Sequence, residues 1–296
     1  MTPCGNNCYT DFCSVARVAN LKRVGILYHP RVETTQLKAG ELQQFLEARG
    51  ISVWLGSSWD TEKARTQIGG TDLILAVGGD GTILRVAQAV VPAAIPITGI
   101  NMGKLGFMTE LSAEEALSKL PDLLAGKGWL DERAMLQVAF GTGAGAKVHH
   151  ALNDVVVARG AIPRVVYVEA SIDDEILKNY RADGVIVATA TGSTGYALAA
   201  GGPILYPQSQ DFILVPIAPH LSASYALVLP PAAVIRLRLS TVHQATLSID
   251  GQLNLPLADG DTITLKRSPH TTRFLRIHPA NYFYQSLKER LMGSSK

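Results

Sequence analysis

The order of apolar and helical segments in the first half of the chain restricts its fold more than any other feature. Between Arg23 and Ala125, short apolar runs alternate with segments that carry apolar residues at helical spacing. The predicted strands are 23–28, 51–55, 73–77 and 95–100, and the predicted helices are 35–49, 83–91 and 113–125. Strand–helix alternation predicts an α/β domain with a parallel, Rossmann-like sheet, because parallel strands need a long connection.

The pattern changes after about Arg133, where short segments alternate apolar and polar residues with a period of two. These predicted strands are 135–140, 150–159, 165–172, 176–181, 185–190, 212–217, 233–239, 245–249 and 261–266. We therefore expect an all-β, sandwich-like second domain. The predicted organisation is a disordered leader at 1–20, an α/β domain at 21–133, a β-rich domain at 134–276, and a C-terminal segment at 277–296. Its helix, at 284–292, is expected to return to the first domain.

Charge and cysteine content exclude several classes of protein. With 27 Lys and Arg against 25 Asp and Glu, the net charge of +2 is too small for the broad basic surface that nucleic-acid binding needs. The apolar runs are too short to span a membrane, so a cytoplasmic protein is expected. The three cysteines, Cys4, Cys8 and Cys13, fit either a metal or redox motif or an unstructured leader, and we assign them no role.

A buried strand that runs directly into a glycine-rich turn and a helix points to phosphate binding. In the segment TDLILAVGGDGTILR, Gly78, Gly79, Gly81 and Thr82 follow the strand 73–77. Glycines at such a strand end let main-chain N–H groups approach a phosphate. Asp80 does not fit this purpose, since phosphate repels a carboxylate. It predicts a contact with a hydroxyl or a metal ion, or simply a cap on the next helix.

The string GGDGT at 78–82 resembles the signature of NAD kinases, diacylglycerol and sphingosine kinases and, more loosely, phosphofructokinases. Four further segments resemble NAD kinases specifically. They are GINMGKLGFM at 99–108, ALNDVVV at 151–157, RADGVIVATATGSTGYALAAGGP at 181–203, and SIDGQ at 248–252. The resemblance extends from about Arg23 to Arg276 and implies transfer of the γ-phosphate of ATP to the 2′-hydroxyl of the adenosine ribose of NAD.

The resemblance also implies roles for individual residues. Asp80 would be the catalytic base, and Gly78, Gly79, Gly81 and Thr82 would bind the phosphates of ATP. The residues implied to bind NAD are Asp80, Gly81, Arg85, Asn153, Asp154, Arg164, Arg181, Asp183, Thr194, Gly195, Tyr196, Ala197, Leu198, Ala199 and Gln252. Each of the three arginines could instead be an ordinary surface residue. A divalent cation, Mg²⁺ in our expectation, would bind together with ATP, and its protein ligands are unknown. The chain would form a homodimer or homotetramer.

Two positions depart from the family pattern, and two other functions stay open. Gly195 stands where the family usually has alanine, and Ala199 where it usually has serine. One rival is a lipid kinase that uses the same glycine turn, and the other is a sensor that binds pyridine nucleotides without turnover. The lipid kinase would need an apolar acceptor groove, whereas the intact Asp80 argues against the sensor.

Overall fold

The computed structural model describes residues 21–103, 106–141, 147–162, 164–220 and 225–291. The predicted leader, with its three cysteines, lies outside these ranges. Contacts divide the chain into two compact units. Unit 1 comprises residues 1–86, 95–131 and 273–296, and unit 2 comprises residues 87–94 and 132–272. Each unit is described by itself below.

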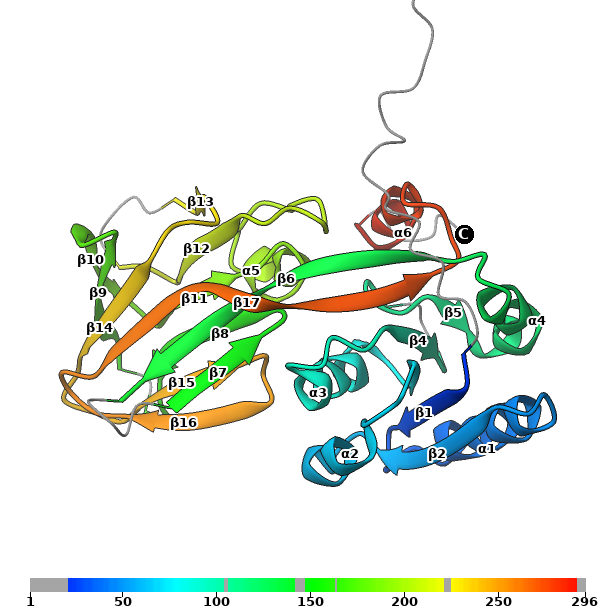
Figure 1. Cartoon of the computed structure of the whole chain (residues 1–296). Coiled ribbons are helices and arrows are strands. Elements are labelled where there is room, and N and C mark those ends of the chain that lie inside the picture. The colour runs from blue at the N-terminus through cyan, green and yellow to red at the C-terminus, as the bar shows by residue number, and fades with distance from the viewer. Residues whose placement is uncertain (1–20, 104–105, 142–146, 163, 221–224, 292–296) are drawn as a thin grey trace, which may run out of the picture. The chain divides into compact units, whose positions relative to one another are not determined.

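Unit 1 is built on a parallel sheet (Figure 1). Its strands are β1 (Arg23–Tyr28), β2 (Ser52–Ser57), β3 (Leu73–Val77) and β4 (Ile97–Asn101), in the spatial order β2-β1-β3-β4. The short β5 (Leu111–Ser112) pairs in parallel with β4. The helices that belong to this unit are α1 (Glu33–Glu47), α2 (Thr61–Gln67), the first part of α3 (Asp80–Val90), α4 (Ala113–Leu124) and α6 (Tyr282–Leu291). The α/β character predicted for this half is therefore observed.

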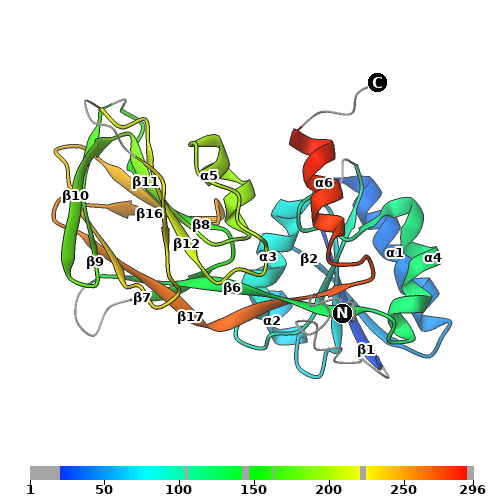
Figure 2. The same cartoon turned by 90° about the horizontal axis from the view of Figure 1, so that it is seen from above.

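Helices α1 and α4 cover one face of this sheet and lie side by side (Figure 2). They bury apolar side chains against alternate residues of the strands, such as Leu73 and Leu75 of β3. Local sequence sets their ends. Gly50, with φ 76°, follows α1, and a capping box between Ser112 and Glu115 starts α4. Because β1 pairs in parallel with β2 and β3, the carboxyl ends of these strands lie at one edge, where ligands collect in such sheets.

Unit 2 consists of two sheets whose observed strand pairs are antiparallel. One sheet contains β6 (Trp129–Phe140), β7 (Lys147–Ala151), β9 (Val166–Ile172), β10 (Glu175–Ala182), β14 (Ile235–Ser240) and β17 (Thr262–Arg276). The other has the order β13-β12-β11-β8-β15-β16, with β8 (Asp154–Arg159), β11 (Gly184–Ala188), β12 (Phe212–Ile217), β13 (Leu227–Leu229), β15 (Ala245–Ile249) and β16 (Leu253–Leu257). One buried apolar cluster draws side chains from both sheets.

The two-residue period divides the six-stranded sheet into two faces. On β8, Val155 and Val157 enter the cluster shared by the sheets, whereas Val156 points to the opposite face. A second, smaller apolar cluster covers part of this opposite face, and Ala197 of the short helix α5 (Tyr196–Ala199) belongs to it. The opposite face is the one that carries the pocket described below.

Several boundaries differ from those that the sequence predicts. The contacts divide the units after Asp131 and after Thr272, rather than after Arg133 and Arg276. Strands β6 and β17 run through both points without a turn, so no local signal marks them. The region 150–159 forms parts of two strands instead of one. The segment 192–199 is a 3-10 turn (Gly192–Thr194) followed by α5. Helix α2 and strands β5, β13 and β16 were not predicted.

Among the helices that the structure describes, none has the length and apolar character needed to cross a membrane.

A buried ionic cluster ties the last strand of the chain to the loop that follows β4. The Arg276 guanidinium lies 3.2 Å from a carboxylate oxygen of Glu110 and 3.2 Å from one of Asp131, and donates to the Met108 carbonyl at 2.8 Å. All three charged side chains are at most 7% exposed. Burial alone would raise the pKa of Glu110, but hydrogen bonds from His278 and the Arg276 charge lower it overall. The buried charges of the cluster therefore stabilise one another.

Replacing Arg276 with Met is expected to lower the free energy of unfolding of unit 1 by about 3–5 kcal/mol, because it removes the buried guanidinium that pairs with the carboxylates of Glu110 and Asp131. All three tryptophans, Trp54, Trp59 and Trp129, belong to unit 1, so urea denaturation followed by tryptophan fluorescence reports on this unit. Lys127→Ala, which removes an exposed ion pair with Asp122 in the same unit, should leave the midpoint almost unchanged. Equal effects of the two substitutions would contradict the assignment.

Candidate active site

The glycine-rich turn lies at the carboxyl edge of the unit 1 sheet, between β3 and α3. Gly78 has a φ of 152°, and a Cβ there would lie 2.3 Å from the Thr82 hydroxyl oxygen. Gly79 and Gly81 are exposed, and a Cβ on either would meet no atom within 4 Å. Gly78 is therefore required by packing within the turn, while Gly79 and Gly81 leave the main chain open to a ligand.

Asp80 is the first residue of α3, and its carboxylate is held by the loop that follows β4. It accepts hydrogen bonds from the backbone N–H groups of Phe107, at 2.8 Å, and Met108, at 3.1 Å. Gly106 makes this contact possible, because a Cβ at that position would lie 1.8 Å from an Asp80 carboxylate oxygen. The segments GGDGT and GINMGKLGFM are thus two halves of one arrangement, of which Lys104 and Leu105 lie outside the described residues. The observed contacts of Asp80 position it rather than cap α3.

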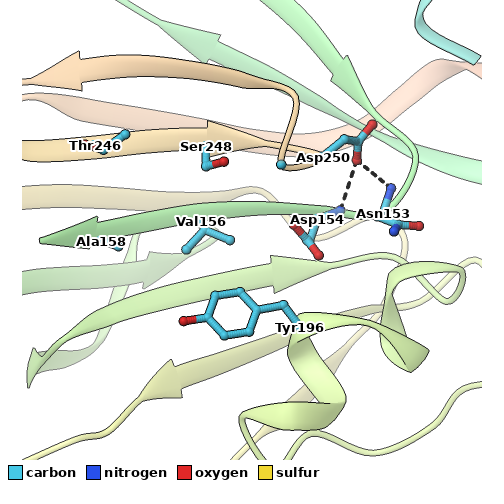
Figure 3. A pocket seen from close by; sticks show the side chains of 9 residues that line it. Asn153, Asp154, Val156, Ala158, Tyr196, Thr246, Ser248 and Asp250 are labelled. Atoms are coloured by element: carbon cyan, nitrogen blue, oxygen red, sulfur yellow. Dashed lines mark hydrogen bonds between the residues drawn. The ribbon is translucent and has the colours of Figure 1, made fainter. Parts of the chain in front are cut away.

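A pocket of about 340 Å³ opens on the face of the six-stranded sheet of unit 2 that carries α5 (Figure 3). Its lining residues are Asn153, Asp154, Val156, Ala158, Tyr196, Thr246, Ser248, Asp250 and Gly251. Strand register explains this set, because β15 pairs with β8 so that Thr246 lies opposite Ala158 and Ser248 opposite Val156. Tyr196 comes from α5 and is 47% exposed. The pocket therefore combines two carboxylates, an amide, hydroxyls and one aromatic ring.

Asp250 organises the polar end of this pocket. Its carboxylate accepts hydrogen bonds from three successive backbone N–H groups, those of Leu152, Asn153 and Asp154, at 2.9, 2.7 and 3.2 Å. Figure 3 marks the bonds from Asn153 and Asp154. The Gln88 side chain donates to the same carboxylate at 3.0 Å and also to the His150 carbonyl. Asp250 has a left-handed backbone (φ 52°) in a hairpin turn with Gly251 (φ 63°), as the sequence allows for an Asp-Gly pair.

The two carboxylates of the pocket influence one another. Burial, reinforced by the nearby Asp250 carboxylate, raises the pKa of Asp154 to about 7. Burial also raises the pKa of Asp250, although four hydrogen bonds from Leu152, Asn153, Gln88 and Asp154 act in the opposite direction. Asp154 can therefore exchange a proton near neutral pH, which is typical of a functional site.

The turn after β11 fits against the same strand end. The Asn153 carbonyl accepts a hydrogen bond from Thr189 N–H at 2.8 Å, and the Thr189 hydroxyl donates to the Leu152 carbonyl at 2.6 Å. A Cβ on Gly192 would lie 2.1 Å from the Asn153 carbonyl oxygen, so only glycine fits there. Asn153 Oδ1 and Gln252 Oε1 are buried and have no hydrogen-bond partner among the described residues. Unused buried acceptors of this kind are suited to a ligand that donates hydrogen bonds.

The structure brings some of the predicted NAD-binding residues to this pocket and leaves others elsewhere. Asn153, Asp154 and Tyr196 line it. The remaining predicted residues in unit 2 are not among its lining residues: Arg164, Arg181, Asp183, Thr194, Gly195, Ala197, Leu198, Ala199 and Gln252. Arg164 and Arg181 are exposed, Asp183 forms an ion pair with Arg159 at 3.2 Å, and Ala197 is buried against the sheet. Asp80, Gly81 and Arg85 belong to unit 1.

Asp250, Ser248 and Thr246 are pocket residues that the sequence analysis missed. They occupy every second position of one strand and its turn, while Ala245, Leu247 and Ile249 between them enter the core. This alternation was visible in the sequence as a polar face on a half-buried strand. It identifies the face, but only the pairing of β15 with β8 shows that the face belongs to a site.

Within the described ranges, no group of three or more His, Cys, Asp or Glu side chains is placed to hold a metal ion.

Comparison with protein-family models identifies both halves of the chain. Residues 56–128 match the ATP-NAD kinase N-terminal domain, and residues 152–277 match the ATP-NAD kinase C-terminal domain. The chain belongs to the ATP-NAD kinase family. Among its relatives, a Dehalococcoides mccartyi NAD kinase is 47% identical over 93% of this chain and 98% of its own. A Chloroflexus aggregans NAD kinase is 43% identical over 93% of this chain and all of its own.

Solved structures of the family resemble the chain as well. Yeast NADH kinase, in a complex with NADH, matches 93% of this chain and 89% of its own with a TM-score of 0.83 and 25% identity. An Archaeoglobus fulgidus NAD kinase, in a complex with ATP, matches 90% of this chain and 98% of its own with a TM-score of 0.75 and 27% identity.

Gly192→Ala should disturb this kinase by forcing the Asn153 backbone away from the new methyl group. We expect a loss of about 1–3 kcal/mol in the stability of unit 2 and at least a tenfold loss of phosphotransfer activity. Calorimetric melting and a steady-state kinase assay measure the two effects. The control for stability is Gly195→Ala in the same turn, where the nearest atom to an added Cβ is the Gly192 carbonyl oxygen at 3.3 Å, so the melting temperature should fall much less. If Gly192→Ala melts and turns over like the wild type, the close approach is not required.

Proposed function

We propose that this protein is an NAD kinase that transfers the γ-phosphate of ATP to the 2′-hydroxyl of the adenosine ribose of NAD, yielding NADP. The observation that supports this proposal is that one chain of this family contains both the complete GGDGT turn and a polar pocket. In the turn, the Asp80 carboxylate is held by the N–H groups of Phe107 and Met108. The pocket, in unit 2, would bind the dinucleotide. The printed descriptions of its relatives and structural neighbours name NAD kinases, an NADH complex and an ATP complex.

In this proposal, the cation binds as part of the donor substrate. ATP is used as its complex with a divalent ion, Mg²⁺ in our expectation, which neutralises phosphate charge. No three-ligand site was found among the described residues, so we assign the ion no protein ligands. The residues of unit 1 bind and orient the donor.

We assign two tasks to the glycine-rich turn. The N–H groups near the exposed Gly79 and Gly81 would hold donor phosphates. Asp80 would accept a hydrogen bond, and then the proton, from the 2′-hydroxyl as the oxygen of that hydroxyl attacks the γ-phosphorus, whose bond to the β-phosphate oxygen breaks so that ADP leaves. The bonds from Phe107 and Met108 keep one carboxylate orientation, which reduces the cost of aligning the base.

Asp80→Asn should lower kcat by about 10²-fold or more, because the amide cannot receive the proton. Gly106→Ala should cause a similar loss with Asp80 intact, since the new methyl group would displace its carboxylate. Gly103→Ala in the same loop is the matched control, because a Cβ there meets no atom of the described residues within 4 Å. Single-turnover formation of NADP, with NAD binding measured separately, distinguishes chemistry from affinity. Near wild-type turnover of a folded Asp80→Asn protein would remove the assignment of the base.

In unit 2, we propose that Asn153 and Asp154 bind ribose hydroxyls of the dinucleotide. An ionised carboxylate accepts two hydroxyl hydrogen bonds, and the unpaired Asn153 oxygen can accept another. Tyr196 offers a ring surface for adenine. Because the pKa of Asp154 is about 7, this carboxylate is partly protonated at neutral pH, and a protonated acid accepts fewer hydrogen bonds.

The value of kcat/KM for NAD should therefore rise with pH up to about 7 and then level off, since deprotonation of Asp154 in the free enzyme creates the better acceptor. Asp154→Asn should remove this rise and lower the plateau, with little change in KM for ATP. Initial rates between pH 5.5 and 8.5 in a buffer of constant ionic strength provide the test. A profile that keeps its inflection in Asp154→Asn assigns the titration to another group.

One assay separates this function from its rivals. NAD, NADH and a diacylglycerol in detergent micelles are each offered with Mg–ATP, and phosphorylated products are separated. A product only from the lipid would establish a lipid kinase. Binding of NADP without any turnover would establish a sensor.

From the resemblance of this chain to the family, we also propose a Rossmann-like unit 1, a sandwich-like unit 2 and packing of the C-terminal helix on unit 1. On the same basis we propose a cytoplasmic location and a homodimer or homotetramer. We also propose the contacts that the resemblance implies, with adenosine at Asp183 and 194–199, and with other parts of NAD at Gln252, Arg164 and Arg181. Some of the adenosine contacts would cross a subunit boundary. Light scattering coupled to gel filtration measures the size of the oligomer.

A further inference from the structure

An unusual cationic cluster surrounds an exposed tryptophan of unit 1. The Arg31 guanidinium carbon lies 4.3 Å, and that of Arg85 4.9 Å, from the centre of the Trp59 ring. The imidazole of His29 meets the same indole edge-to-face, with ring centres 5.5 Å apart. Trp59 remains 38% exposed. Three nitrogen-rich side chains, two from the segment after β1 and one from α3, therefore converge on one ring.

The location of this cluster follows from the topology of the sheet. His29 and Arg31 follow the end of β1, Trp59 follows the end of β2, and Arg85 lies on α3. Strands β2, β1 and β3 are parallel neighbours, so their carboxyl ends share one edge. The glycine-rich turn leaves β3 at that edge and leads into α3. The cluster is thus on the ligand-binding side of the sheet.

The charges of the cluster are not compensated within the part of the chain that the structure describes. Neither guanidinium has a carboxylate partner within the 4.0 Å that defines an ion pair. Contact with an aromatic face offsets only part of the repulsion between two like charges. In addition, the hydroxyl of the buried Ser58, next to Trp59 in the chain, has no hydrogen-bond partner among the described residues. An anion would satisfy groups that the protein leaves unpaired.

We propose that Arg31 and Arg85, held on Trp59, form the subsite for the triphosphate of the phosphoryl donor. This inference rests on the proposed function and names the residues that bind the donor's charge. Two forked guanidiniums can each bind a phosphate in bidentate fashion, and a triphosphate carries more charge than the pyrophosphate of NAD. The assignment replaces the expectation that Arg85 serves NAD. Trp59 positions both arginines, so it acts through them.

Binding of inorganic tripolyphosphate, measured by calorimetry without NAD, tests the subsite independently of catalysis. Arg31→Gln and Arg85→Gln should each weaken binding about tenfold or more, and should raise KM for ATP while KM for NAD stays within about twofold. The control is Arg49→Gln. Arg49 also stacks on an aromatic ring of unit 1, with its guanidinium carbon 3.5 Å from the centre of Phe45, but follows α1. Its loss should leave tripolyphosphate binding unchanged.

A second measurement needs no variant. Phenylglyoxal modifies accessible arginines, and mass spectrometry of the wild type should show that tripolyphosphate protects Arg31 and Arg85 but not Arg49. Unchanged affinity in the double Arg31→Gln/Arg85→Gln protein, absence of protection, or a rise in KM for NAD alone would each overturn the proposal. If the wild type binds tripolyphosphate at these arginines yet makes no NADP, the proposed function fails while the subsite stands.

Discussion

The carboxylate of Asp250 is the group that holds the pocket of unit 2 together. It lies in a hairpin turn and gathers the N–H groups of residues 152–154, which would otherwise be left unpaired at the start of β8. The same carboxylate accepts a hydrogen bond from Gln88 near the end of α3, and it adds to the rise in the pKa of Asp154 that burial causes. One buried acid therefore sets the backbone geometry of the residues proposed to meet the ribose and contributes to their electrostatics.

Close approach, rather than phosphate contact alone, explains several glycines of the family motifs. Gly106 lets a loop reach the Asp80 carboxylate, Gly78 makes room for Thr82, and Gly192 leaves space for the Asn153 carbonyl. In each case the nearest atom to an added Cβ is within 2.3 Å, too close for any side chain. Gly79 and Gly81 differ, because the space around them is open. The glycines of GGDGT thus divide between internal packing and access for a ligand.

Local patterns predicted much of the fold. Strands β1, β3, β12 and β15 have the predicted bounds, because each is a short apolar or alternating run between clear turn residues. The long strands β6 and β17 and the short helix α2 were harder to predict. Strand ends inside a continuous sheet depend on which neighbour offers hydrogen bonds, and a seven-residue helix has too little periodicity to be recognised.

Residue types at short spacing were enough to identify the family, the glycine turn, and the residues Asp80, Asn153 and Asp154. Which residues lie in one site became clear from the three-dimensional arrangement. It joined Asp80 to residues 107–108, added Asp250, Ser248 and Thr246 to the pocket through the register of β15 with β8, and placed Arg31 and Arg85 on one indole. Such contacts link residues far apart in the chain, and strand pairing sets them, so no local pattern records them.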